Sequence, residues 1–278
     1  MGTGIIQGYR GGGKIGSVQV PLLPGSYVVN PEGYQVPGII DAHQYDYHYL
    51  QGLRVPSASV VLVPDAAWFT ASTINSWIAR VADDFAEIVG GITMADGKEG
   101  LNLTGAKLAG MDFVWNFGQF AQCTLQFLGS GCTEKTLVEC ALAPISARAE
   151  YGAFKYFKLT SPADLKVSSM RLSVSTGVTP NPELANSEYP SEVNAGKLTA
   201  TASFTVQALT TLPANGTPIV FQHATAASTA VQITLANPVF TGLARRAVQP
   251  ARAMRNISAQ LFGTSADGPP VTFADVIP

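Results

Sequence analysis

Apolar and polar residues alternate through the middle of this 278-residue chain, and the alternation constrains the fold more than any other feature. In MDFVWNFGQFAQCTLQFLG, residues 111–129, every second side chain is apolar on both sides of a Gly118-Gln119 turn. Successive side chains of a β-strand point to opposite faces, so a period of two is typical of a half-buried strand. The segment therefore predicts a β-hairpin with one apolar face.

A second hairpin of the same kind is predicted from KVSSMRLSVSTG, residues 166–177, and GKLTATASFTVQAL, residues 196–209. Met170, Leu172 and Val174 alternate with Ser and Arg, and the return strand alternates small or apolar residues with Ser and Thr. The two hairpins resemble weak internal copies, the second with a long excursion between its strands. Short apolar runs predict further strands at 59–64, 217–222, 230–240 and 256–263.

One amphipathic helix is predicted over 73–89, where apolar residues from Ile74 to Val89 recur at spacings of three and four. Ser72 or Thr70 can cap its start, and Gly90-Gly91 can end it. The expected fold class is mainly β, an antiparallel sandwich or split barrel with a flanking helix. We expect a glycine- and proline-rich arm over 1–40, a first unit over 41–150 and a second unit over 151–278.

The composition favours self-association. Charged residues make up only 13% of the chain, against roughly 25% in ordinary soluble domains. A neutral surface rich in Ser, Thr, Gln and Ala is weakly protected against association, so we expect a homo-oligomer. The glycine-rich start has no apolar h-region and no apolar run reaches the ~18 residues of a membrane helix, so neither a signal peptide nor a membrane span is expected.

No motif for catalysis or for a cofactor is complete. The stretch GYRGGGKI, residues 8–15, is one residue short of a phosphate-binding loop, because Ile15 replaces the Ser or Thr that holds magnesium and prolines follow where a helix should run. In HQYDYHYL, residues 43–50, a strand would place His43 and His48 on opposite faces, which favours an aromatic ladder over a metal site. We therefore expect that the chain is not an enzyme and that it binds neither a cofactor nor a metal ion.

Cys123, Cys132 and Cys140 show neither CxxC nor zinc spacing, and we expect free thiols in a reducing cytoplasm. The dense basic cluster consists of four arginines near the C-terminus, without interleaved aromatic residues: Arg245, Arg246, Arg252 and Arg255. This cluster contacts either a neighbouring subunit, which we favour, or DNA.

The run of Ser and Thr on the second hairpin suits a water-lined lumen better than a hydrophobic interface. Residues 166–206, KVSSMRLSVSTGVTPNPELANSEYPSEVNAGKLTATASFTV, resemble the long strand, protruding loop and return strand of the tail tube (major tail) proteins of long-tailed bacteriophages. The C-terminal MRNISAQLFGTSADGPPVTFADV is similar to the closing strand and glycine turn of that family.

This resemblance implies a subunit whose long hairpins join those of its neighbours in one inner β-barrel. Rings of three or six chains would stack into a hollow tail tube through which DNA passes without sequence-specific binding. The residues implied for the lumen face or wall are Ser169, Arg171, Ser173, Thr199, Thr201, Ser203, Thr205, Gln122, Thr124 and Gln126, with Asp112 and Asn116 as further equivalents. The loop 177–196 would contact the next ring through Pro180, Pro182, Glu183, Glu188, Pro190 and Glu192.

The implied partners are other copies of the chain and the tape measure, tail terminator and distal tail proteins, and the implied location is the virion tail, after assembly in the host cytoplasm. Such lumens tend to be negative, which keeps DNA phosphates from sticking, whereas the face expected here is neutral to slightly basic at Arg171 and Lys197. Two alternatives stay open. One is another tail-ring or decoration protein, and the other is a carbohydrate- or ligand-binding β-sandwich that uses Trp115 and Tyr45, Tyr47 and Tyr49.

Overall fold

A computed structural model describes most of the residues of the chain. They are 12–16, 18–20, 27–30, 54–66, 68–79, 85–89, 100–116, 119–135, 157–162, 165–181, 189–207, 212–226, 229–247, 253–265 and 268–277. The aromatic segment 43–50 and Cys140 lie outside them.

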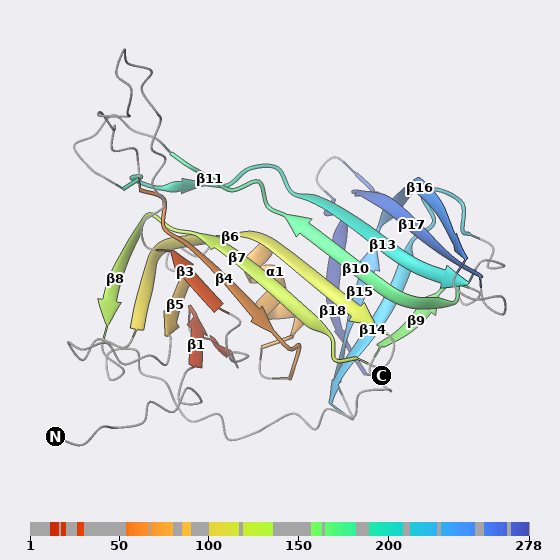
Figure 1. The fold of residues 1–278 in the computed structure, drawn as a ribbon, viewed down its shortest axis with the longest axis horizontal. Helices are drawn as coiled ribbons and strands as arrows, with labels where there is room; N and C mark the ends of the chain where they lie inside the picture. The colour runs from red at the N-terminus through yellow and green to blue at the C-terminus, as the bar shows by residue number, and fades with distance from the viewer. Residues whose placement is uncertain are drawn as a thin grey trace, which may run out of the picture.

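A wide antiparallel sheet forms the body of the molecule (Figure 1). It confirms the mainly β fold and the expected hairpins, since β6 pairs with β7 and β10 pairs with β13. Across the sheet the strands follow the order β3 (Tyr27–Asn30), β4 (Ser57–Leu62), β7 (Gln122–Leu128), β6 (Gly100–Asn116), β10 (Val167–Ser175), β13 (Thr199–Gln207), β17 (Ala253–Phe262) and β16 (Asn237–Ala247). The β6–β10 pairing joins the two expected units in one sheet.

Strand β6 belongs to two parts of this sheet. Its residues 107–116 pair with β7 and β10, whereas its residues 100–106 pair with β5 (Phe85–Val89) and β8 (Gly131–Lys135). Strands β1 (Gly12–Ile15) and β2 (Val18–Val20) continue the sheet beyond β5. The strand changes partners at Gly105, which has a φ of 56° that favours glycine, and the Ser130 N–H donates to the Thr104 carbonyl at 2.9 Å in the facing strand.

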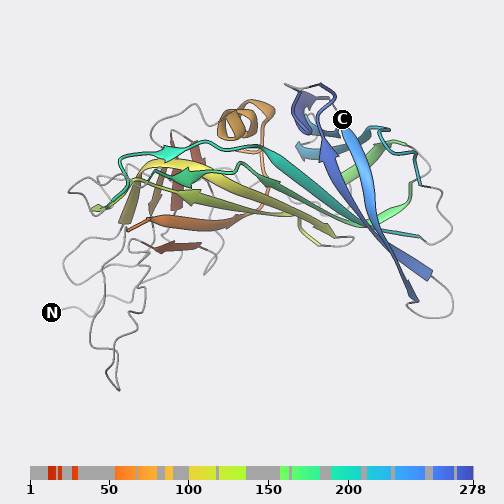
Figure 2. The ribbon, with the colours of Figure 1, turned by 90° about the horizontal axis from the view of Figure 1, so that it is seen from above.

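A smaller sheet and one helix cover the same face of the large sheet (Figure 2). The small sheet has the order β18 (Val271–Val276), β15 (Thr229–Leu235), β14 (Ile219–Ala226) and β9 (Phe157–Ser161), all antiparallel. The helix α1 (Ala71–Ala79) lies beside β18, where its Ala71 N–H donates to Asp275 Oδ1 at 2.8 Å. The chain is thus a sandwich whose core lies between the large sheet and these two elements.

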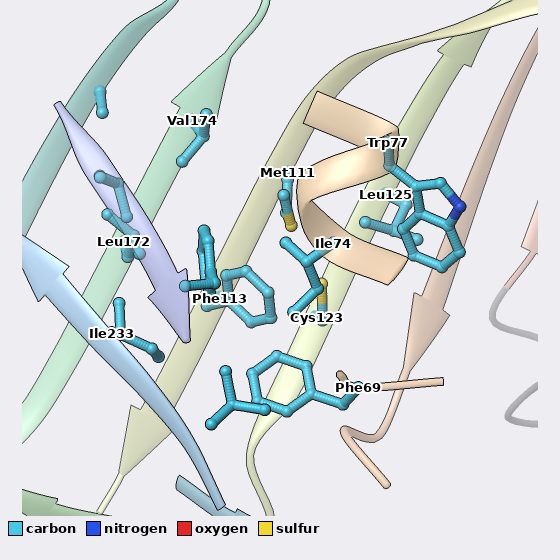
Figure 3. Close-up of a cluster of buried hydrophobic side chains, with 14 of the residues drawn as sticks. Phe69, Ile74, Trp77, Met111, Phe113, Cys123, Leu125, Leu172, Val174 and Ile233 are labelled. Atoms are coloured by element: carbon cyan, nitrogen blue, oxygen red, sulfur yellow. The ribbon is translucent and has the colours of Figure 1, made fainter. Parts of the chain in front are cut away.

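The core is built from the apolar half of the alternating strands. Figure 3 shows Ile74 and Trp77 of α1 pointing toward Met111, Cys123 and Leu125 of the large sheet. Phe204 stacks on Phe221 of the small sheet with ring centroids 5.9 Å apart. Phe113 contacts both Phe69 and Phe273, at 5.5 Å and 6.2 Å between centroids. This packing leaves the polar residues of the same strands on the opposite face.

The predicted helix over 73–89 is wrong in its second half. The helix begins at Ala71, Thr70 Oγ1 accepts from the Thr73 N–H at 3.2 Å as expected of a cap, and the helix ends at Ala79. Residues 85–89, FAEIV, form β5 and pair with β1 and β6. Short apolar runs fit a helix and a strand equally well, and here the hydrogen-bonding partners on β1 and β6, which are distant in sequence, decide for the strand.

Candidate functional site

The large sheet carries one continuous polar face, on the side opposite the core. Each of its residues is exposed or half-buried, and most are Ser, Thr, Asn or Gln. We define the polar face by its residues on β7, β6, β10, β13 and β17: Gln122, Thr124, Gln126, Asp112, Val114, Asn116, Ser169, Arg171, Ser173, Ser175, Thr199, Thr201, Ser203, Thr205, Asn256, Ser258 and Gln260.

The strand register aligns these side chains in rows across the sheet. One row runs Thr124, Asp112, Ser173, Thr201 and Gln260, with each residue paired to the next. The neighbouring row is Gln122, Val114, Arg171, Ser203 and Ser258, and the next is Asn116, Ser169, Thr205 and Asn256. Thr205 Oγ1 donates to Asn256 Oδ1 at 3.1 Å within that row. Hydroxyl and amide groups therefore cover the face at regular cross-strand spacing.

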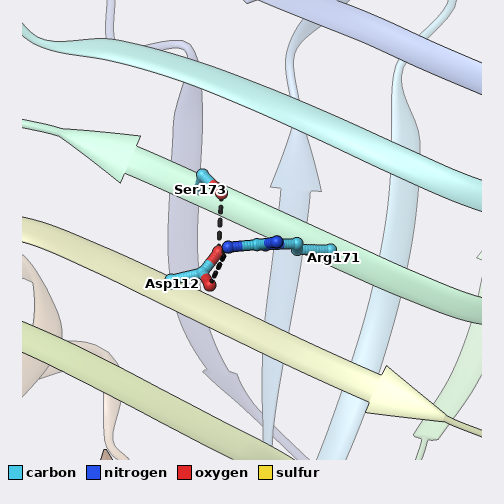
Figure 4. A network of polar contacts seen from close by, with 3 residues as sticks. All are labelled: Asp112, Arg171 and Ser173. Atoms are coloured by element: carbon cyan, nitrogen blue, oxygen red, sulfur yellow. Dashed lines mark hydrogen bonds and ion pairs between the residues drawn. The ribbon is translucent and has the colours of Figure 1, made fainter.

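An ion pair lies in the middle of the polar face (Figure 4). Arg171 Nη2 and Asp112 Oδ2 are 2.7 Å apart, and Arg171 Nε donates to Asp112 Oδ1 at 2.8 Å. Ser173 Oγ donates to the same Oδ1 at 2.6 Å. The hydrogen bond and charge of Asp112 raise the pKa of Arg171, so the guanidinium stays protonated.

The polar face carries no net formal charge, because Asp112 and Arg171 are its charged residues and they form a pair. Lys197 is exposed and lies two residues before Thr199, the first residue of β13. From the sequence alone, the face is expected to be neutral to slightly basic at Arg171 and Lys197. Asp112, which is 59 residues away in sequence, neutralises Arg171.

All the residues implied for a lumen from the sequence lie on the polar face, together with Asp112 and Asn116. The structure adds Asn256, Ser258 and Gln260, because β17 pairs directly with β13. The alternation in 256–261 was visible in the sequence, but nothing there indicated which strand would be the neighbour. The face is thus one strand wider than the two hairpins alone.

The loop 177–196 begins with a narrow base that packs on its own chain. Thr179–Pro180 forms β11 and pairs with Val193–Asn194, which forms β12. Val193 is buried, as is Pro190, whereas Glu192 is exposed. Pro182, Glu183 and Glu188 lie outside the described residues, so the predicted ring contact of this loop stays a prediction.

Trp115 is unavailable to a ligand, because it is buried in the core. Its Nε1–H donates to Nδ1 of the buried His223 at 3.3 Å. Burial lowers the pKa of His223 to about 4, against a smaller opposing effect of a backbone hydrogen bond to Pro64. Trp115 and His223 are therefore structural, and the proposed aromatic binding platform loses its tryptophan; its tyrosines lie outside the described residues.

Two members of the arginine cluster are backbone partners in the sheet, since Arg245 on β16 pairs with Arg255 on β17. Arg246 pairs with Met254, and Arg252 lies outside the described residues. The Nε of Arg255 is buried and has no hydrogen-bond partner.

Other kinds of site find no support in the part of the chain that is described. Cys123 and Cys132 are free thiols, and burial raises the pKa of both, with Asp112 and Glu134 adding to the effect respectively. Among the described residues, no three His, Cys, Asp or Glu side chains are placed to hold a metal ion. Within the same residues no helix has the length and apolar character needed to cross a membrane.

Comparison with known proteins adds no family assignment. No protein-family model matches the chain, and no curated protein matches its sequence significantly.

Proposed function

We propose that the chain is a structural virion protein, the subunit of a bacteriophage tail tube, and that it works by assembly without catalysis. The observation that carries the proposal is the polar face, which is five strands wide and nearly free of charge. An exposed sheet face of an ordinary soluble protein carries many Lys, Glu, Asp and Arg residues, because charge keeps proteins apart. A face that lines a water-filled conduit needs polar groups but no such protection.

The edge of the large sheet supports the same proposal. Among the described residues, β16 pairs only with β17, although it is eleven residues long. Long unpaired edges promote association, and most proteins shorten, cover or charge them. A strand from a second copy on this edge would extend the polar face from one subunit to the next. In this proposal three or six subunits close a ring, the rings stack, and DNA passes through the lumen.

The tape measure, tail terminator and distal tail proteins would be the partners of such a tube, and the virion tail would be its location. These assignments rest on the resemblance of residues 166–206 and of the C-terminal segment to tail tube proteins. The polar face and the open edge agree with them.

Negative-stain electron microscopy of the purified chain over a concentration series tests the proposal. We expect hollow tubes or stacked rings of uniform diameter at high concentration. Single rings that never stack would favour another tail-ring or decoration protein. Dispersed monomers at all concentrations would contradict an assembly function.

A further inference from the structure

We infer that Asp112 shields DNA from Arg171, so that the polar face passes a polyanion without binding it. The inference rests on the proposed function, because it names double-stranded DNA as the molecule that moves along this face. Its physical basis is the ion pair between Asp112 and Arg171, in the middle of rows of neutral side chains.

The geometry of the pair is that of a specific clamp. Two atoms of the guanidinium, Nε and Nη2, contact the two oxygens of one carboxylate at 2.8 Å and 2.7 Å. This fork arrangement is the one that arginine also uses to bind phosphate. Ser173 donates to the carboxylate from the side at 2.6 Å and so fixes its orientation. Asp112 thus occupies the donor pair that a DNA phosphate would otherwise engage.

Exposure makes the shield necessary. The Arg171 side chain is 62% exposed and the Asp112 side chain 26%, so the guanidinium projects from the face more than the carboxylate does. An unpaired arginine in this position would release counterions from DNA and bind it, and a ring would repeat that contact in every subunit. A neutral pair leaves the phosphates hydrated and free to move.

A purely structural role for the pair predicts a different result. Exposed ion pairs contribute little to stability. With a purely structural role, replacing the carboxylate by an amide would therefore lower the unfolding midpoint slightly and leave the affinity for DNA unchanged. DNA affinity separates the two roles, because only removal of a shield creates a new positive site.

The test measures binding of a short mixed-sequence DNA duplex to the full-length chain by fluorescence anisotropy at low ionic strength. The variant Asp112→Asn keeps the size of the side chain and frees the charge of Arg171. We expect it to bind at least about tenfold more tightly than the unchanged chain, with an affinity that falls as salt rises. The matched control Asp112→Asn with Arg171→Gln is neutral again, and its affinity should return to the starting level. Arg171→Gln alone leaves a carboxylate and should bind no more tightly than the unchanged chain.

Equal affinity of Asp112→Asn and the unchanged chain overturns the inference, as does tight binding that persists in the double variant. Asp112→Ser repeats the measurement if thermal unfolding shows that the asparagine variant is not folded. Tube formation is scored separately by microscopy. Tubes without the affinity change would refute the shield alone, whereas the affinity change in a chain that never assembles would refute the conduit alone.

Discussion

At the scale of single residues, the core holds a buried histidine, His223, whose protonation opposes folding. His223 is 6% exposed, and its Nδ1 accepts from Trp115, so the proton of the neutral ring is on Nε2. Its pKa is about 4 in the folded chain, against an ordinary value of 6.5. Between these two values the unfolded chain takes up a proton that the folded chain does not.

We therefore expect the free energy of unfolding to be unaffected by His223 above pH 6.5 and to fall as the pH drops toward 4. The lost stability approaches about 3 kcal/mol at the acidic end. Urea unfolding at several pH values measures the slope. His223→Gln is the control, because it removes the titrating group. Between pH 6.5 and pH 4 its free energy of unfolding should fall by about 3 kcal/mol less than that of the unchanged chain. Equal slopes for both chains would show that His223 does not titrate on unfolding.

Residue-scale electrostatics was also where the sequence was least informative. The sequence predicted that residues 169–175 and 199–205 share a face, because the alternation alone determines which side chains point the same way. It could not show that Asp112 contacts Arg171, because the β6–β10 pairing brings together strands from different hairpins. Of the two positive charges expected at this face, Arg171 is paired with Asp112 for this reason.

At the scale of elements, the point at which β6 changes partners depends on glycine. Gly105 has a φ of 56°, and a Cβ atom there would collide with the Ser130 side chain. Gly16 has a similar φ of 58° with nothing within 4 Å of its Cβ position. The two glycines thus share a backbone conformation and differ in their surroundings.

We expect Gly105→Ala to lower the free energy of unfolding by about 2–3 kcal/mol, from backbone strain plus displacement of Ser130. Gly16→Ala should cost only about 1 kcal/mol, because strain alone acts there. Chemical denaturation of both variants gives the comparison. Equal losses of stability would show that the close approach between Gly105 and Ser130 adds nothing to the cost of a Cβ atom at position 105.

Elements were predicted well where a local period decides and poorly where a distant partner does. The strands at 111–127 and 166–207 follow from alternation, and their pairing within each hairpin follows from the short connection or the matched pattern. Residues 85–89 satisfy a helical spacing and still form a strand, because β6 offers them backbone hydrogen bonds. The β13–β17 pairing, which widens the polar face, had no local signal either.

At the scale of the whole molecule, the two faces of the large sheet have opposite chemistry. One face packs against α1 and the small sheet, and the other presents neutral polar rows beside β16, whose outer edge pairs with no other strand among the described residues. Association through the edge, with the polar face turned inward, accounts for the low charge of the chain and for the regular rows together.

The most direct test of this account is a cryo-electron microscopy reconstruction of the assembled protein, in which the position of the polar face can be read. We expect a hollow ring or tube with Ser173, Thr201 and Ser203 facing the lumen. An assembly in which these residues face the outer surface, or pack against another chain, would contradict it.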